Sequence, residues 1–268
     1  MRPIILARND TDWQDEAEVA KKYFPTTFSR MEIKAGDLVI PRFSALPFYK
    51  EQEHDINYVG ASMINTYSMH RYIADLMNWY EDLKDYTPKT YTRLVDLPEK
   101  GPFILKGETN SKKFLWKTHM FALDKKEAIA VEGRLHADSL ITYQNIYIRE
   151  YVKLKTFMVG LQDLPITNEY RFFCYKDTIL SGGYYWSSHI EDLKENGIEV
   201  NINQVPQEFL RKIINIVKDK VNAYVIDVAE TQSGEWIVIE LNDLAMSGLS
   251  ENDPEVMYSN LKKVLENG

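Results

Sequence analysis

The chain has 268 residues, of which 44% are hydrophobic and 27% are charged, and it contains 12 Gly and 10 Pro. This composition excludes a disordered, collagen-like or low-complexity chain, and the length allows a substantial core in one large or two modest domains. The formal net charge of -8 argues against a general duplex-binding surface, although the local run Lys112, Lys113 and Lys117 is suited to a phosphate-rich ligand.

The single cysteine, Cys174, lies between aromatic residues in the segment YRFFCYKD. This excludes a disulfide framework and indicates a buried structural thiol in a reducing, cytoplasmic setting. The apolar run in MRPIILARNDTDW is too short for the hydrophobic region of a signal peptide, and no other stretch approaches the length of a membrane span. We therefore expect a soluble, cytoplasmic protein with no membrane partner.

Residues 1–95 show the alternation of strands and helices expected of a small α/β unit. Strands are predicted at residues 3–7 and 37–41. In SMHRYIADLMNWYEDL the apolar residues recur at three- and four-residue spacing, which predicts one helix with Ser68 as its N-cap. His70 and Arg71 flank the apolar stripe, so both are expected at the helix surface or its cap, and Arg71 is also placed to face a ligand cleft.

From about residue 96 the chain becomes strand-rich, with the segments PFILKG, NIYIREYV and EYRFFCYKDTILSGGYYW. Helices are predicted at residues 206–220, which carry an apolar face, and from Pro254, where Asp253 supplies a start signal. The pattern is typical of an antiparallel α+β fold. We therefore expect a small α/β domain over residues 1–95 and a larger antiparallel domain over residues 96–268.

The segment FILKGETNSKKFLWK combines a strand with a loop that suits phosphate. The strand ends in Lys106, whose rigidly held ammonium group suits the oxygens of an α- or β-phosphate, and Thr109, Asn110 and Ser111 add polar donors. The same residues also fit an exposed basic turn. The segment alone therefore indicates a phosphate site without establishing it.

The segment NIYIREYVK is an apolar strand interrupted by Arg149 and Glu150 just before Tyr151 and Val152. Adenine pockets often use such a segment, because its backbone groups bind the edge of the base while apolar side chains enclose the ring. A nearby carboxylate is then able to accept the ribose hydroxyls. The alternative is a strand with a polar edge.

The segment TNEYRFFCYKDTILSGGYYW predicts two strands joined by a turn at Lys176 and Asp177. Glu169 and Arg171 are two residues apart and therefore share one strand face. Arg171 is placed to clamp a phosphoryl group or a substrate carboxylate through paired donors. The alternative is a surface ion pair with Glu169, which would contribute under about 1 kcal/mol.

The segment YVIDVAETQSGEWIVIELNDLAMSGLS predicts a hairpin of two β-branched strands around Ser233 and Gly234, a favoured turn pair. If these two residues form the loop, Asp227 lies directly opposite Glu240. Asn242 then lies on the same face, because it follows Glu240 by two residues. Three oxygen donors therefore converge.

Two facing carboxylates repel, and an unpaired charge is costly to bury, so a bound cation is the expected remedy. Oxygen ligands without Cys or His nearby suit Mg²⁺ or Mn²⁺, and Mg²⁺ also binds substrate phosphates. Asp227, Glu240 and Asn242 are therefore predicted to hold the cation of a metal-phosphate site. The alternative is an ordinary hairpin with a solvated polar face. The other hairpin residues expected in the core are Ile226, Val228, Ile237 and Ile239.

The order of these segments resembles the ATP-grasp enzymes. A small α/β domain precedes a lysine strand, a flexible loop, an R-E-Y-V segment like an adenine-binding hinge, an arginine strand and a final Asp…Glu-x-Asn hairpin. Within the superfamily, EYRFF and IELNDLAMSGL look most like a clade of bacterial and phage proteins named for paired arginine and lysine positions. The resemblance implies an ATP-grasp fold in which antiparallel sheet subdomains enclose an ATP cleft.

The resemblance also implies which residues bind ATP and Mg²⁺ (or Mn²⁺). Lysines on and after the first strand would contact the phosphates, with the choice among Lys112, Lys113 and Lys117 open, and the hinge would hold the adenosine. One departure is that many members carry an earlier nucleotide-binding lysine, whereas this chain has His70 and Arg71 in that region. The residues implied at the nucleotide, the transferred phosphoryl group and the metal are Lys106, Ser111, Lys113, Glu150, Tyr151, Val152, Arg171, Asp227, Glu240 and Asn242.

The activity implied is that of an ATP-dependent ligase, in which a carboxylate attacks the γ-phosphate and an amine or other nucleophile then displaces phosphate from the acyl phosphate. Catalysis would rest on positioning and on charge neutralisation by Mg²⁺, Lys106 and Arg171. Its substrates would be small-molecule or peptide carboxylates and amines, or a modified nucleic-acid end.

Two other functions use the same groups. The first is a metal-dependent nuclease, but such sites usually place a lysine two residues after the Glu, where this chain has Asn242. The second is a nucleotide-binding module without catalysis. Turnover of ATP separates the second from a ligase.

Overall fold

The first part of the chain is a parallel sheet whose strands are joined by helices. The structure, a computed structural model, describes residues 1–8 and 13–267. Residues 4–7 are all buried, as expected for a parallel strand covered on both faces, and the strands predicted at residues 3–7 and 37–41 are confirmed. The sheet has the order β2-β1-β3-β4 and contains β1 (Arg2–Ala7), β2 (Thr26–Thr27), β3 (Asp37–Arg42) and β4 (Ser62–Met63), with the helices α1 (Gln14–Tyr23) and α2 (Tyr49–Tyr58).

The single helix predicted after this sheet is wrong, because the chain forms two helices, α3 (Tyr67–Ala74) and α4 (Leu76–Leu83). Asp75 separates them with an extended backbone, and its side chain accepts a hydrogen bond from the Met77 N–H, which caps α4. Thr66, and not Ser68, caps α3. The apolar spacing continues through Asp75, so the spacing alone could not reveal the break.

The central sheet is antiparallel and has the order β5-β8-β6-β7. Asp124 caps its helix by accepting a hydrogen bond from the Glu127 N–H at 2.9 Å, and the apolar side of that helix packs on the sheet. Its elements are β5 (Thr90–Tyr91), β6 (Lys100–Gly107), β7 (Phe121–Asp124), α5 (Lys125–His136) and β8 (Ile146–Glu150).

The last sheet is antiparallel as well and has the order β12-β11-β13-β14. The turn predicted at Lys176 and Asp177 and the helix start predicted at Asp253 and Pro254 are confirmed. This part comprises the ribbon β9 (Thr156–Val159) and β10 (Pro165–Thr167), the strands β11 (Glu169–Tyr175), β12 (Thr178–Tyr184), β13 (Ala223–Glu230) and β14 (Trp236–Asp243), and the helices α6 (Ile190–Glu195), α7 (Gln207–Val217) and α8 (Pro254–Asn267).

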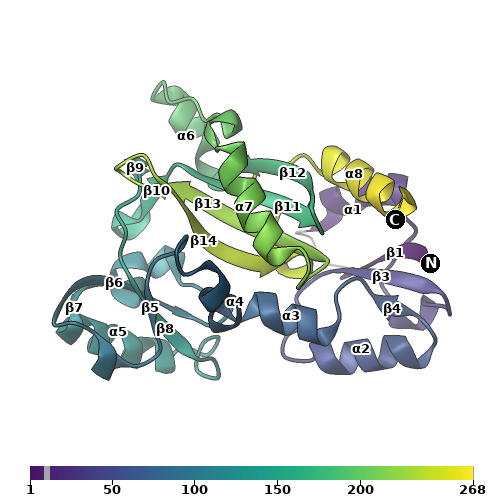
Figure 1. The fold of residues 1–268 in the computed structure, drawn as a ribbon, viewed down its shortest axis with the longest axis horizontal. Coiled ribbons are helices and arrows are strands. Elements are labelled where there is room, and N and C mark those ends of the chain that lie inside the picture. Colours follow the sequence, from purple (N-terminus) through teal and green to yellow (C-terminus); the bar gives the residue numbers. More distant parts are fainter. Residues whose placement is uncertain (9–12, 268) are drawn as a thin grey trace.

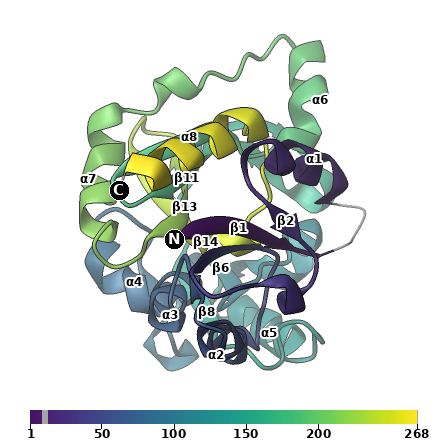
Figure 2. The ribbon, with the colours of Figure 1, turned by 90° about the vertical axis from the view of Figure 1, so that its right-hand side faces the viewer.

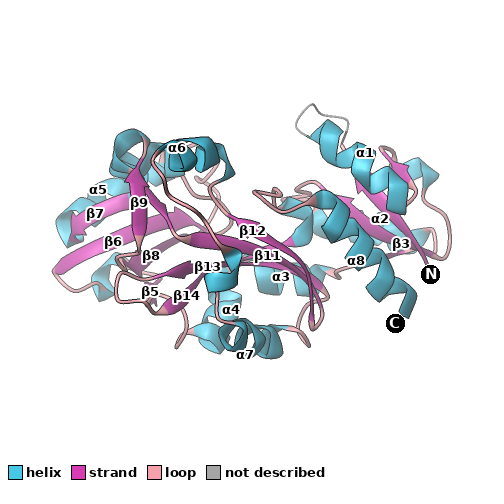
Figure 3. Cartoon of the chain, turned by 90° about the horizontal axis from the view of Figure 1, so that it is seen from above, coloured by secondary structure: helices cyan, strands magenta, loops and turns pink. Residues whose placement is uncertain are grey.

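The two faces of the last sheet are covered by different helices (Figure 3). The apolar stripe of α7 joins Phe172 and Ile226 in one buried cluster, which also holds the fully buried Cys174, as predicted for a structural thiol. On the other face α8 joins Phe173 and Val225. Strand residues alternate between faces, so Glu169 and Arg171 on β11 and Asp227 on β13 lie on the same face as Phe173 and Val225.

The last sheet lies between the central sheet and the parallel sheet (Figure 1), and α8 packs beside α1, with the two ends of the chain close together (Figure 2). The predicted α+β class, with antiparallel sheets after a small α/β unit, is confirmed. Since β5 precedes residue 95 yet pairs with β8, the division into residues 1–95 and 96–268 stays a prediction. Among residues 1–8 and 13–267 no helix has the length and apolar character needed to cross a bilayer.

Candidate active site

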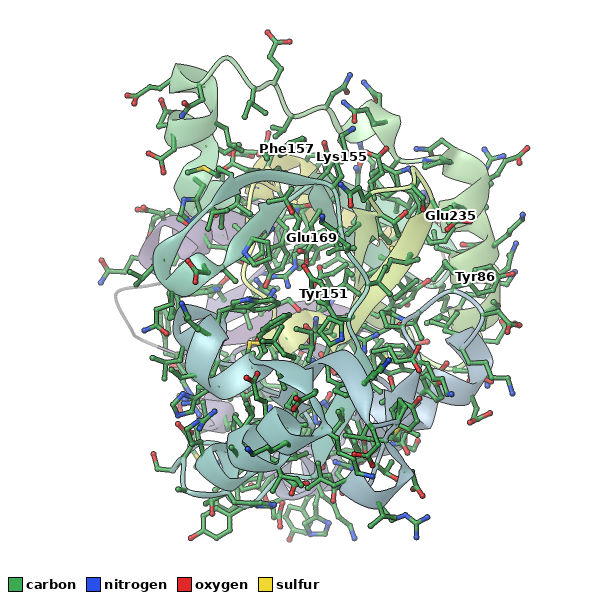
Figure 4. The ribbon with its side chains drawn as sticks, turned by 90° about the vertical axis from the view of Figure 1, so that its left-hand side faces the viewer. Tyr86, Tyr151, Lys155, Phe157, Glu169 and Glu235 are labelled. Carbon is green, nitrogen blue, oxygen red and sulfur yellow. The ribbon has the colours of Figure 1, made fainter. Side chains whose placement is uncertain are left out.

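A cleft lies between the central sheet and the last sheet, and residues of both sheets line it (Figure 4). Apolar side chains from both sheets form much of its wall, as an adenine ring requires. The structure brings six residues expected at a nucleotide to this cleft, namely Lys106, Ser111, Lys113, Glu150, Tyr151 and Val152.

The segment after β8 supplies the wall suited to a base. Tyr151 is tied to β6 by a hydrogen bond from its N–H to the Pro102 carbonyl at 3.0 Å. Val152 lies next to it, and within the described part of the chain its N–H has no backbone or side-chain acceptor. A free backbone donor beside apolar side chains is the arrangement by which proteins bind the edge of a heterocyclic base.

The turn of the β13–β14 hairpin is longer than predicted. It spans residues 231–235 and is closed by hydrogen bonds from the Thr231 N–H to the Glu235 carbonyl (2.7 Å) and from the Gly234 N–H to the Thr231 carbonyl (3.0 Å). Gly234 has a φ of 90°, which glycine adopts without the strain that a side chain would bring. The two-residue turn at Ser233 and Gly234 is therefore wrong.

A bulge restores the register that the longer turn would have shifted. Val238 pairs with Val228 and Glu240 pairs with Asp227, so Ile239 is an extra residue on β14. Asp227 and Glu240 therefore lie opposite one another, as predicted, although the predicted turn was wrong.

The bulge also changes which hairpin residues are buried. Ile226 and Val228 lie in the core as predicted, and Val238 joins them. Ile237 and Ile239 instead line the cleft, so the prediction that they belong to the core is wrong. The carbonyl of Ile239 accepts a hydrogen bond from Arg149 at 2.6 Å, which holds the bulge against the central sheet.

Each facing carboxylate has a cationic partner, so the premise that they are unpaired is wrong. Arg171 donates to both oxygens of Asp227, from Nε to Oδ1 and from Nη2 to Oδ2, each at 2.8 Å. Lys106 forms an ion pair with Glu240 across the cleft. Arg171 therefore pairs across the sheet with Asp227 rather than with Glu169 on its own strand.

Burial and charge act together on the Lys106–Glu240 pair. Burial lowers the pKa of Lys106, although the charge of Glu240 acts in the opposite direction. Burial also opposes ionisation of Glu240, but the charges of Lys106 and Lys113 outweigh it and lower the pKa of that carboxyl. Lys106 is only 5% exposed, so an uncompensated charge at this position would be costly.

The predicted metal ligands lie close together on the β13–β14 hairpin, and Glu240 among them lines the cleft. The Asn242 Nδ2 lies 3.4 Å from the Asp227 Oδ2, and Glu240 faces Asp227 across the hairpin. In residues 1–8 and 13–267 no group of three or more His, Cys, Asp or Glu side chains is arranged to hold a metal. The oxygens that suit Mg²⁺ here are therefore two carboxylates and one amide.

The loop after β6 separates its three lysines. Lys113 enters the cleft, where its Nζ donates to the Tyr185 Oη at 2.6 Å and lies 4.0 Å from Glu169. Lys112 pairs with Asp138 at 2.7 Å, outside the cleft. Lys117 pairs with Asp163 on the exposed surface. Lys113 is therefore the loop lysine at the candidate phosphate end.

Two aromatic residues after β12 were not singled out from the sequence. The Tyr185 ring lies 3.9 Å from the Lys113 ammonium and 4.8 Å from the Arg171 guanidinium, so it separates two like charges. Trp186 lines the cleft beside them. Their position directly after an arginine strand and its hairpin partner is the only sequence signal that points to them.

Glu169, which the sequence allowed as a surface residue, is buried in the cleft, whereas Glu150 is the more exposed of the two carboxylates. Glu150 is half-exposed and accepts a hydrogen bond from the Tyr91 hydroxyl at 2.6 Å. Glu169 is 3% exposed and lines the cleft, and burial raises its pKa while Lys113 offsets part of that rise. The surface ion pair considered for Glu169 is therefore wrong.

A second pocket, lined in part by Ser44, Tyr67, Gln144 and Met246, lies on the other side of the loop after β6. Asn242 lines this pocket, whereas Glu240, two residues earlier on β14, lines the first cleft, so the hairpin presents metal-suited oxygens to both cavities.

Arg71 lines the second pocket and pairs with Glu108 at 2.7 Å and with Asp75 at 3.0 Å. His70 is fully buried, stacks on Tyr49 and bonds Asp243 at 3.1 Å, so its predicted place at the helix surface is wrong.

A family model described as ATP-grasp domain, R2K clade family 3, matches residues 95–261. The match includes all ten residues that the sequence placed at the nucleotide, the phosphoryl group and the metal. A search of curated proteins found no match.

Solved ATP-grasp structures share the fold over nearly the whole chain. A RimK domain ATP-grasp protein from Sphaerobacter thermophilus is 14% identical, with 97% of this chain and 99% of that chain covered and a TM-score of 0.58. The D-alanine–D-alanine ligase of Bacillus anthracis, complexed with ATP, is 12% identical, with 99% of both chains covered and a TM-score of 0.59. The ATP-grasp ligase PsnB, complexed with minimal precursor, Mg and ADP, is 10% identical, with 98% of both chains covered and a TM-score of 0.59.

Proposed function

Since the chain belongs to the ATP-grasp domains of R2K clade family 3, we propose that it is an ATP-dependent ligase that activates a carboxylate as an acyl phosphate for an amine or other nucleophile. The observation that supports this most is the pairing of Lys106 with Glu240 and of Arg171 with Asp227 at the end of an apolar cleft. Cations held on rigid strands are the means by which phosphoryl transfer is accelerated without a protein nucleophile.

The proposed nucleotide lies along the cleft. The adenine occupies the apolar end, where Tyr151 and Val152 supply the wall and a backbone donor. The phosphates occupy the opposite end, where Lys106 and Lys113 converge and Ser111 adds a hydroxyl. Glu150 lies at the mouth of the base pocket, beside Tyr91.

The donor set fits Mg²⁺ or Mn²⁺. The ammonium group of Lys106 donates a hydrogen bond to Oε1 of Glu240. Within the described residues, Oε2 of Glu240 and Oδ1 of Asn242 have no hydrogen-bond partner. Asp227 keeps lone pairs on both oxygens that Arg171 contacts. When bound, the cation neutralises phosphate charge; Asp227, Glu240 and Asn242 are the residues that would hold it.

The proposed reaction has two steps. An oxygen of the substrate carboxylate attacks the γ-phosphorus, the bond to the β,γ-bridging oxygen breaks, and ADP leaves. The nucleophile, with its lone pair free, then attacks the acyl carbon and inorganic phosphate departs. Arg171 is positioned to neutralise the charge on the transferred group, and the second pocket, which Asn242 lines, offers room for the acceptor.

The substrates proposed are small-molecule or peptide carboxylates and amines. Among similar structures, one is a D-alanine–D-alanine ligase and another is the ATP-grasp ligase PsnB complexed with a minimal precursor. The proposal therefore does not extend to nucleic-acid ends. The nuclease alternative is not favoured, because the chain belongs to the ATP-grasp domains of R2K clade family 3 and has Asn242 where such nuclease sites usually place a lysine.

Lys106→Ala is expected to weaken Mg-ATP binding at least about tenfold and also to lower the melting temperature of the free protein. The first effect follows from the lost phosphate contact, and the second from leaving the Glu240 charge buried without its partner. Lys106 is buried and paired with Glu240, so its loss is expected to affect the stability of the fold as well as ATP binding. Calorimetric titration with ATP and Mg²⁺, with thermal melts, measures both effects.

The double variant Lys106→Met with Glu240→Leu separates the two roles. Removing both charges is expected to restore the melting temperature, because neither partner is left alone, while ATP binding stays weak. ATP affinity equal to that of the wild type in a folded Lys106→Ala protein would remove the phosphate role from this lysine.

A further inference from the structure

The bulge in β14 has hydrogen-bond partners that lie outside the hairpin. The Val238 carbonyl accepts a hydrogen bond from the Thr87 hydroxyl at 2.8 Å, and the Val238 N–H donates at 2.7 Å to the carbonyl of Tyr86, a residue labelled in Figure 4. The next carbonyl, of Ile239, accepts from Arg149 at 2.6 Å. Because β14 is an edge strand, backbone groups on its outer side find no partner within their own sheet. The bulge is therefore held from outside that sheet.

The two side chains that hold the bulge also bind each other. The Arg149 Nη2 donates to the Thr87 hydroxyl at 2.5 Å, and that hydroxyl in turn donates to the Val238 carbonyl. Arg149 lies on β8 of the central sheet, and Thr87 lies shortly before β5, which pairs with β8. Two consecutive carbonyls of the bulge are thus fixed by one connected pair of side chains on the far side of the cleft.

The guanidinium of Arg149 is costly to keep at this position. It is 5% exposed, and in the described part of the chain no carboxylate forms an ion pair with it and its Nε has no hydrogen-bond partner. Burial lowers the pKa of Arg149 to about 10, although the charge of Glu240 acts in the opposite direction. A buried cation without a paired counter-ion is destabilising, so its contacts with the bulge indicate a role other than stability.

The bulge decides which way Glu240 points. Successive strand residues alternate between faces, so a register without the extra residue Ile239 would turn the Glu240 carboxylate away from Asp227. Glu240 follows Ile239 directly, and the Ile239 carbonyl that Arg149 holds is the last backbone carbonyl before it. Fixing that carbonyl therefore fixes the direction of the carboxylate.

We propose that Thr87 and Arg149 are positioning residues that hold the bulge in register and so set the affinity of the site for its divalent cation. This inference rests on the proposed function, since it takes Glu240 as a ligand of Mg²⁺ or Mn²⁺. Thr87 is not one of the described residues that line the cleft, so its hydroxyl acts on the cation through the backbone of β14. Loss of a group that orients a metal ligand typically costs about 10–100-fold in metal affinity.

The test measures how much Mn²⁺ tightens nucleotide binding in Thr87→Val, which keeps the shape of the side chain but removes its hydroxyl. The β,γ-imido analogue of ATP is titrated calorimetrically in Mn²⁺ and again in EDTA, and the ratio of the two affinities gives the coupling between metal and nucleotide. Thr87→Val is expected to lower this ratio about tenfold and to keep the affinity in EDTA within about twofold of the wild type. Thr87→Ser keeps the hydroxyl and is expected to retain the wild-type ratio.

Thr90→Val is the matched control. Thr90 and Thr87 are both 8% exposed, but the Thr90 hydroxyl donates to the Pro88 carbonyl at 3.0 Å, within its own segment. Thr90→Val is therefore expected to keep the wild-type ratio. Arg149→Lys covers the case in which Thr87→Val does not fold. It is also expected to lower the ratio, because an ammonium group lacks the planar fork that binds both acceptors.

A wild-type ratio in folded Thr87→Val or in Arg149→Lys would overturn the inference even if the melting temperature fell, because the contacts would then serve stability alone. A Thr87→Ser protein that behaves like Thr87→Val would overturn it too, since the hydroxyl would not be the cause. Wild type that binds the nucleotide equally in Mn²⁺ and EDTA would instead overturn the metal site of the proposed function, and wild type that does not bind it would overturn the nucleotide site.

Discussion

Glu240→Gln is expected to lower ATP turnover by about a hundredfold or more while it also destabilises the free protein. The substitution keeps the shape but deletes a charge that is proposed to hold Mg²⁺, and the loss of one preorganised electrostatic contact typically costs 10²–10³ in rate. It also leaves the ammonium group of Lys106, which is 5% exposed, without a counter-ion. Breaking such a buried pair costs about 3–5 kcal/mol, and the amide oxygen that remains keeps the loss near the lower limit.

Thermal melts with and without Mg-ATP, run beside a turnover assay, measure the effects of Glu240→Gln. A smaller stabilisation by Mg-ATP is expected together with the lower melting temperature of the free variant. Glu235→Gln, on the exposed turn of the same hairpin, is the matched control and should leave every quantity unchanged. A Glu240→Gln protein with wild-type turnover and wild-type stabilisation by Mg-ATP would contradict the metal role.

Arg171→Lys is expected to lower turnover by about a hundredfold and to reduce the free energy of unfolding by about 1.5–3 kcal/mol. Lysine keeps the charge but cannot reproduce the two parallel hydrogen bonds to Asp227, which is 1% exposed. The guanidinium also donates to the Gly248 carbonyl at 2.9 Å. Lysine loses this contact, because its single ammonium group lacks the branched donors of arginine. Denaturant unfolding and steady-state kinetics measure the two losses.

The exposed pair of Arg93 and Asp96 offers a matched control for Arg171→Lys. It too has two short contacts, at 2.8 and 3.0 Å, but its side chains are largely in solvent, where ion pairs contribute little. Arg93→Lys should therefore change neither turnover nor stability. If Arg171→Lys behaved like Arg93→Lys, the buried pair would have no role in catalysis.

Much of the fold follows from local sequence signals. The strands of the first sheet, the turn at Lys176 and Asp177, and the start of α8 depend on short-range periodicity and capping, and all were predictable. The break at Asp75 was not, because the apolar spacing of α3 and α4 continues across it. The Asp75 side chain caps α4 and also accepts a hydrogen bond from the Tyr147 hydroxyl at 2.7 Å. The second contact depends on the tertiary fold, so the local sequence does not reveal it.

The candidate site was predictable in its residues but not in its pairing. The face shared by Asp227 and Glu240 follows from strand alternation, and it survived an incorrect turn only because the bulge at Ile239 shifted the register back by one residue. The ion pairs of these carboxylates join different sheets or strands, so no local pattern contains them. For the same reason the sequence did not indicate that Glu169 lines the cleft or that Tyr185 contacts Lys113.

The most direct test of the account follows oxygen from the carboxylate to phosphate. A panel of amino acids and short peptides with ¹⁸O-labelled carboxylates would be incubated with the protein, ATP, Mg²⁺ and hydroxylamine as a general nucleophile, and the released phosphate analysed by mass spectrometry. An acyl phosphate intermediate predicts ADP, a hydroxamate, and inorganic phosphate carrying one ¹⁸O from the substrate. Formation of AMP and pyrophosphate, ADP release with unlabelled phosphate, or ATP binding without turnover across the panel would contradict it.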